Sequence, residues 1–164
     1  GDVTDWFNYF IVDCGTADGV DKNCPVITPD GLVGIVSEAG LNSSKVLTVV
    51  DEQNVLMCRI ERSNELVRIK GVSSENMKYE LLLDRISADS SLYVGDKIVT
   101  ASSGDVYPEG IAVGTVSEII IDNKTGERTA KIDIAVDING LSTVYVMAGA
   151  NNVSSEISGG ESAN

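Results

Sequence analysis

The segment ITPDGLVGIVSE at residues 27–38 recurs in longer form as VTASSGDVYPEGIAVGTVSE at residues 99–118. Both copies consist of a strand-like stretch that ends in Thr, a loop, and a second strand-like stretch that is interrupted by glycine. Glycine inside a strand usually marks a bulge, a barrel corner or a close approach of two backbones. The internal repeat therefore predicts two related small β-barrels, and the alternative is a chance similarity between valine-rich strands.

Residue composition favours an all-β fold along the whole chain of 164 residues. Val and Ile together number 36, whereas Leu and Ala together number 20. β-branched side chains are stiff and lie well on a pleated surface, and they are mildly penalised in helices. Sixteen glycines supply the tight turns that short strands need. We expect ten to twelve short strands and little or no helix.

The charge balance and the absence of histidine exclude several classes of function. Twelve Lys and Arg against twenty-five Asp and Glu give a formal charge of −13. This balance argues against nucleic-acid binding, because phosphate neutralisation needs a cationic patch. Without histidine, Ser-His-Asp and Cys-His catalysis and imidazole metal sites are excluded. No stretch approaches 18 apolar residues, so we expect no membrane span within the sequence.

The three cysteines, Cys14, Cys24 and Cys58, do not have the Cys-x-x-Cys spacing of a zinc or redox site. We interpret them as small hydrophobic side chains, with one Cys–Cys bridge as the alternative.

The glycine, proline and polar residues in and around the repeat have structural interpretations. Glycines at barrel corners would let strands bend where a side chain would clash, and Asp96 would accept hydrogen bonds from nearby backbone N–H groups. Pro108 would preset φ for the turn before Gly110. The structural motif residues are Gly31, Gly34, Gly95, Asp96, Thr100, Pro108, Gly110 and Gly114.

These motifs resemble those of the extracytoplasmic β-domain of the MreC family, which determines rod shape during bacterial cell-wall elongation. The similarity rests on Trp6, VDCG at residues 12–15, DGV at 18–20 and PVITPDGLVG at 25–34. It is most specific in GDKIVT at residues 95–100 and YPEGIAVG at 107–114.

The resemblance implies two six-stranded β-barrels in tandem, with a trypsin-like double-barrel arrangement but no protease machinery. Residues 6–148 would form this double barrel, one barrel from about 30–90 and the other from 6–29 plus 91–148. Residues 1–5 would be a linker from a preceding coiled coil. Residues 149–164 are rich in Ser, Gly and Asn, and we expect a disordered tail there.

The function implied by the resemblance is a non-catalytic scaffold that needs no cofactor and no metal. It would organise class B penicillin-binding proteins, together with the membrane proteins MreD and RodZ, which link it to MreB. It would also self-associate as a homodimer or a higher oligomer. It would lie on the extracytoplasmic face of the bacterial cytoplasmic membrane, anchored by a transmembrane helix that precedes this sequence.

Aromatic residues near the start of the chain are the candidate partner interface. Trp6, Phe7, Tyr9 and Phe10 make up half of the eight aromatic residues and fall on both faces of one strand-like stretch. Aromatic side chains are enriched in interface cores. The alternative is that they are buried between the two barrels.

Two other functions stay open from the sequence. A histidine-free hydrolase would need a Ser-Lys dyad, for which Ser102 or Ser103 near Lys97 is the best candidate. A ligand-binding module would need a pocket with converging polar groups.

Overall fold

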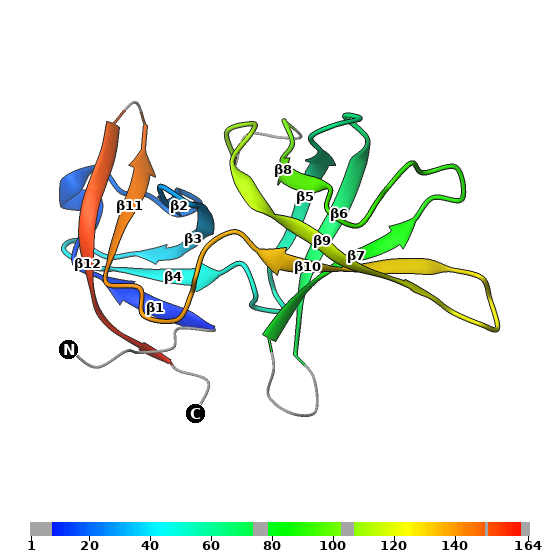
Figure 1. Cartoon of the computed structure of the whole chain (residues 1–164). Helices are drawn as coiled ribbons and strands as arrows, with labels where there is room; N and C mark the ends of the chain where they lie inside the picture. Colours follow the sequence, from blue (N-terminus) through cyan, green and yellow to red (C-terminus); the bar gives the residue numbers. More distant parts are fainter. Residues whose placement is uncertain (1–7, 74–78, 103–106, 150, 162–164) are drawn as a thin grey trace. The chain divides into compact units, whose positions relative to one another are not determined.

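The computed structural model describes residues 8–73, 79–102, 107–149 and 151–161. Within these residues the chain forms twelve β-strands, and its one helical segment is the short 3-10 turn η1 (Thr16–Asp18). The chain divides into two compact units, residues 1–51 with 136–164 and residues 52–135. Each unit contains one closed six-stranded antiparallel barrel (Figure 1). The predicted all-β fold with two six-stranded barrels is confirmed.

The first barrel combines strands from both ends of the chain. Its strand order around the barrel is β1-β12-β11-β2-β3-β4. The strands are β1 (Tyr9–Val12), β2 (Pro25–Thr28), β3 (Gly31–Ala39), β4 (Ser44–Thr48), β11 (Thr143–Ala148) and β12 (Asn151–Glu161). Closure pairs both edges of every strand, so this barrel presents no open edge to solvent along its paired residues.

The second barrel is built from one continuous stretch of the chain. Its strand order is β10-β7-β6-β5-β8-β9. The strands are β5 (Val55–Ile60), β6 (Leu66–Ser73), β7 (Tyr79–Ile86), β8 (Lys97–Thr100), β9 (Ala112–Ile121) and β10 (Arg128–Ile134). Figure 1 shows the β9–β10 hairpin as a long arm of this barrel.

The strand β12 corrects the predicted disordered tail at residues 149–164 over residues 151–161, whereas residues 150 and 162–164 lie outside the described residues. β12 pairs with β11 on one side and with β1 on the other. Its inward side chains alternate along the strand: Ser155 is buried, and Val153 and Ile157 are partly buried against the core. The tail contains few apolar side chains, but these lie at the period of two that a half-buried strand requires. The backbone hydrogen bonds of β1 and β11 supply the rest of its stabilisation.

The boundaries of the two barrels also differ from the prediction. We expected one barrel from about 30–90 and the other from 6–29 plus 91–148, whereas the units meet near residues 51 and 135. The predicted boundary at residue 30 separates β2 from β3, although these strands form a tight hairpin in which Thr28 pairs with Gly31. A short hairpin stays within one sheet, so β2, β3 and β4 belong together. In the structure, residues 52–135 lie in sequence between the two segments of the first unit.

The internal repeat corresponds to the same local structure in both barrels. The Asn23 N–H donates to the Val36 carbonyl at 2.8 Å, and the Gly95 N–H donates to the Val116 carbonyl at 2.8 Å. Asn23 and Gly95 both have positive φ, 76° and 96°. The β2–β3 and β8–β9 ladders also share a bulge, since each register skips one valine of the second strand. The two copies therefore share the same local backbone geometry, beyond a shared valine content.

Two glycines of the repeat lie where neighbouring backbones approach each other closely. A Cβ on Gly34 would lie 2.0 Å from the Leu47 carbonyl oxygen in β4. A Cβ on Gly114 would lie 2.3 Å from the Asp133 carbonyl oxygen in β10. Only a residue without a side chain fits at these positions, as the corner-glycine interpretation predicts.

Candidate functional site

The predicted aromatic interface is resolved only in part. Trp6 and Phe7 lie outside the described residues. Phe10 is fully buried in the core of the first barrel, which corrects its assignment as an interface residue. Period-two alternation places Phe10 on the inward face of β1, so Tyr9 points to the other face. Tyr9 is half-buried, and the Lys45 ammonium lies 4.4 Å from its ring centroid. Among the described residues of this set, Tyr9 is the one that remains a contact candidate.

Thr100 joins the loop of the second repeat copy to its strands. Its side chain has no exposed surface. The hydroxyl donates to the Pro108 carbonyl at 2.6 Å and accepts from the Ile111 N–H at 2.9 Å. The Gly110 N–H donates to the Thr100 carbonyl at 2.9 Å. Gly31, Gly95 and Gly110 all have positive φ. The geometry of these motif residues shapes turns and leaves no reactive group exposed.

Asp96 lies at the centre of a turn and an ion pair. Its carboxylate accepts from the Tyr93 N–H at 2.8 Å and from Arg62 Nε and Nη2, each at 2.9 Å. The Arg62 guanidinium also lies 4.6 Å from the Tyr93 ring centroid. The hydrogen bond from Arg62 is the main reason why the pKa of Asp96 lies below its ordinary value. Asp96 therefore serves as the predicted turn acceptor, and Arg62 is a partner that the sequence pattern did not indicate.

The proposed Ser-Lys pair does not come together in the described part of the chain. Lys97 and Ser102 are exposed, and no described residue forms a hydrogen bond with either side chain. Ser103 lies outside the described residues. The described residues contain no cluster of three or more His, Cys, Asp or Glu that could hold a metal ion. Asp122, in the β9–β10 turn, caps that turn instead: its Oδ1 accepts from the N–H groups of Lys124 and Thr125 at 2.8 and 3.0 Å.

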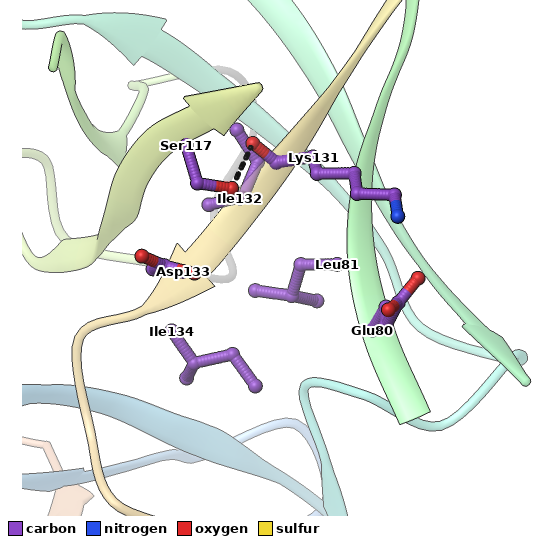
Figure 2. A pocket seen from close by; sticks show the side chains of 7 residues that line it. All are labelled: Glu80, Leu81, Ser117, Lys131, Ile132, Asp133 and Ile134. Atoms are coloured by element: carbon purple, nitrogen blue, oxygen red, sulfur yellow. Dashed lines mark hydrogen bonds between the residues drawn. The ribbon is translucent and has the colours of Figure 1, made fainter. Parts of the chain in front are cut away.

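One hollow of about 210 Å³ lies on the second barrel where β7 and β10 run side by side. Figure 2 shows Leu81 of β7 and Ile134 of β10 next to each other in this hollow, with charged groups around them. The Ser117 hydroxyl donates to the Lys131 carbonyl at 3.2 Å. Small-molecule sites usually occupy about 300–1,000 Å³ and have polar groups that converge on the ligand. This hollow is smaller and its polar groups do not converge, so it suits a single side chain of a partner better than a cofactor.

A second hollow of about 310 Å³ lies on the outer face of β5, β6 and β7. Three apolar side chains of this face are exposed: Val55 by 54%, Met57 by 40% and Leu66 by 60%. The hollow is lined by Met57, Leu66, Val67, Arg68, Asp84 and Arg85. The alternation in β5 predicts this outward face, but three apolar residues on it are unusual for a face that meets water. Nothing in the sequence pattern indicates that these side chains surround a hollow.

Charge is distributed unequally between the two units. Residues 1–51 with 136–164 carry two lysines and eleven carboxylates, whereas residues 52–135 carry ten cations and fourteen carboxylates. The first unit therefore has a formal charge of −9 and the second −4. Cations are concentrated on the second barrel, so a partner with carboxylates meets less repulsion there.

The cysteines are free thiols. Cys58 is fully buried, and burial raises its pKa to about 12. Burial also raises the pKa of Cys14. Cys24 is half-buried, and its Sγ accepts from the Asp21 N–H at 3.4 Å. In the second repeat copy this place belongs to Asp96, so Cys24 is a weaker turn acceptor at an equivalent position.

No helix within the described residues has the length and apolar character needed to cross a membrane.

Comparison with known proteins identifies one family throughout. The family model for rod shape-determining protein MreC, barrel core, matches residues 1–148. A curated relative, the cell shape-determining protein MreC of Listeria monocytogenes, is 31% identical over 147 residues, which are 88% of this chain and 49% of the relative. The corresponding protein of Escherichia coli is 27% identical, over 86% of this chain and 38% of the relative. The chain thus spans about half the length or less of these curated relatives.

Solved structures agree with this result. A structure of MreC from Listeria monocytogenes matches with a TM-score of 0.76 and 26% identity, over 98% of this chain and 73% of that one. A complex between a penicillin-binding protein (PBP2) and MreC from Helicobacter pylori matches with a TM-score of 0.57 and 18% identity, over 73% of each chain.

Proposed function

The chain belongs to the MreC family of rod shape-determining proteins, and from this membership we propose that its two barrels act as a scaffold in bacterial cell-shape determination. The scaffold lies outside the cytoplasmic membrane and holds cell-wall synthases through protein–protein contacts. It contributes no catalytic group of its own. MreD, RodZ, an indirect link to MreB, and self-association remain predictions from the family resemblance.

The observation that carries this proposal is the family match over residues 1–148, combined with the complex that a similar fold forms with a penicillin-binding protein. Two features of the molecule support it. The side chains of the motif residues Asp96 and Thr100 form hydrogen bonds to other groups of the second barrel, as a structural role requires. The hollow at the β7–β10 junction is smaller than a usual small-molecule site, and the hollow at the β5–β7 face, of about 310 Å³, lies at the lower limit of that range and is bordered by exposed apolar side chains. These features are typical of a contact surface and not of a cofactor site.

Binding to a class B penicillin-binding protein tests the proposal directly. The extracytoplasmic region of that protein, from the organism that encodes this chain, would be immobilised for biolayer interferometry with the purified chain. We expect saturable binding in the micromolar range or tighter. In parallel, cells depleted of the full-length protein should lose their rod shape and regain it with the wild-type gene. Absence of binding, together with unchanged cell width after depletion, would refute the proposal.

A further inference from the structure

The outer face of β5, β6 and β7 carries exposed apolar side chains that gather around one hollow. Met57 and Leu66 are exposed on neighbouring strands and line the hollow of about 310 Å³, which we call the β5–β7 hollow. Exposed apolar side chains that gather around one hollow are typical of contact surfaces, whereas scattered ones are not. A hollow of this size accommodates one large apolar side chain of a partner.

Arg85 at the edge of this hollow has a backbone conformation that arginine rarely adopts. Its φ is +57°, in the left-handed region. It lies at a bulge of β7, because the register with β10 passes from Leu83–Ala130 to Ile86–Arg128. A non-glycine residue in this region costs of order 1 kcal/mol or more, and such strain is often retained where a bulge directs a side chain to a functional position.

Arg85 lines the hollow beside Asp84, whose pKa is lowered mainly by the hydrogen bond from Arg68 and to a lesser degree by the charges of Lys70, Arg68 and Arg85. Arg68 forms an ion pair with Asp84, and Lys70 Nζ lies 3.9 Å from the same carboxylate. Arg85 is exposed, and no described residue forms a hydrogen bond or an ion pair with its guanidinium. Guanidinium groups bind carboxylates through two parallel hydrogen bonds. The hollow thus presents an apolar depression beside a guanidinium that makes no hydrogen bond to the described residues.

We propose that the β5–β7 hollow is the docking site for an acidic–apolar segment of the cell-wall synthase, which rests on the function proposed above. An apolar side chain of that segment fills the space between Met57 and Leu66, and a neighbouring carboxylate accepts two hydrogen bonds from Arg85. Charge complementarity favours this occupant, because the hollow is lined by two arginines and one aspartate in a chain whose formal charge is −13. The competing occupants are an anionic membrane and a second copy of the chain.

Replacing Arg85 with glycine separates binding from folding. Glycine adopts positive φ without strain, so Arg85→Gly should keep or raise the melting temperature while it removes the guanidinium. We expect its affinity for the immobilised synthase region to fall by about tenfold or more, and Leu66→Ser to weaken binding similarly. Asn23→Gly, at another non-glycine residue with positive φ, and Lys124→Gln, which removes one remote cation, are the controls. Both should bind within about twofold of the wild type.

A methionine label reports whether the contact is at the proposed place. In the chain labelled with ¹³C at the methionine methyl groups, the Met57 signal should shift on addition of the synthase region, whereas the signal of Met147 in the other unit should not. The Met57 signal is assigned with Met57→Leu.

Each other outcome overturns the inference in a distinguishable way. Equal binding by Arg85→Gly and the wild type would refute the docking site and leave the proposed function standing. Failure of the wild type to bind would refute both. A wild-type dimer in sedimentation that Arg85→Gly abolishes would make a second copy the occupant. Cosedimentation with phosphatidylglycerol vesicles that depends on Arg85 would make it a membrane.

Discussion

Gly34→Ala should open the first barrel, because the added methyl group has no space. The Cβ would lie 2.0 Å from the Leu47 carbonyl oxygen and 2.9 Å from the Leu47 carbonyl carbon, and both atoms belong to the backbone of β4. Relief requires β3 and β4 to separate by about 1 Å, which lengthens their hydrogen bonds beyond about 3.5 Å. The loss of several ladder hydrogen bonds and of close packing costs about 3–5 kcal/mol. For a barrel of this size, that corresponds to a fall in melting temperature of more than about 10 °C.

Thermal unfolding and hydrogen exchange measured by mass spectrometry would test this expectation together. Gly34→Ala should reduce amide protection in residues 31–48, and Gly114→Ala should do so in residues 112–134, because the clash falls in a different barrel. Gly159→Ala, in β12, is the matched control, since no atom lies within 4 Å of its added Cβ. If Gly34→Ala melts within about 2 °C of Gly159→Ala, the close-approach argument is wrong.

Three further predictions concern a carboxylate, the thiols and the last strand. Because the hydrogen bond from Arg62 lowers the pKa of Asp96, its stabilising contribution is present above the unfolded pKa of about 3.9 and is lost as pH falls through the folded value. In urea titrations Asp96→Asn should therefore be about 2 kcal/mol less stable at pH 7 and depend less on pH below about 4; equal pH profiles would contradict this. At pH 8, iodoacetamide should modify half-buried Cys24 well before Cys58, whose pKa burial raises to about 12, and equal rates by mass spectrometry would refute the burial argument. A chain that stops after residue 150 lacks β12 and should lose amide protection in the first barrel while the second keeps it; unchanged protection would show that the tail strand is dispensable.

Much of the fold could be predicted because its strands carry local signals. β-branched alternation and glycine-rich turns mark nearly every strand, and the repeat predicts two related barrels. Asp96 was recognisable as a turn acceptor because a short carboxylate after glycine commonly bonds to nearby backbone N–H groups. The need for glycine at position 34 was recognisable because glycine inside a strand commonly marks a close approach of two backbones.

The features that sequence reasoning missed depend on distant parts of the chain. β12 has weak local signals, and its partners β1 and β11 come from opposite ends of the chain. The barrel boundary was misplaced because which strands share a barrel is decided by long-range pairing and not by the turns between them. Arg85 has no sequence signal at all, since its positive φ arises from the register of β7 against β10.

The way the first barrel draws on both ends of the chain has a consequence for the order of folding. Tyr9 of β1 pairs with Glu161 of β12, whereas the second barrel uses only residues 52–135. During synthesis from the amino terminus, the second barrel can therefore form before the first barrel, because the first barrel still lacks β11 and β12 at that stage. Until the eleven residues of β12 have been synthesised, β1 keeps one unpaired edge, and pairing with β12 then closes the first barrel.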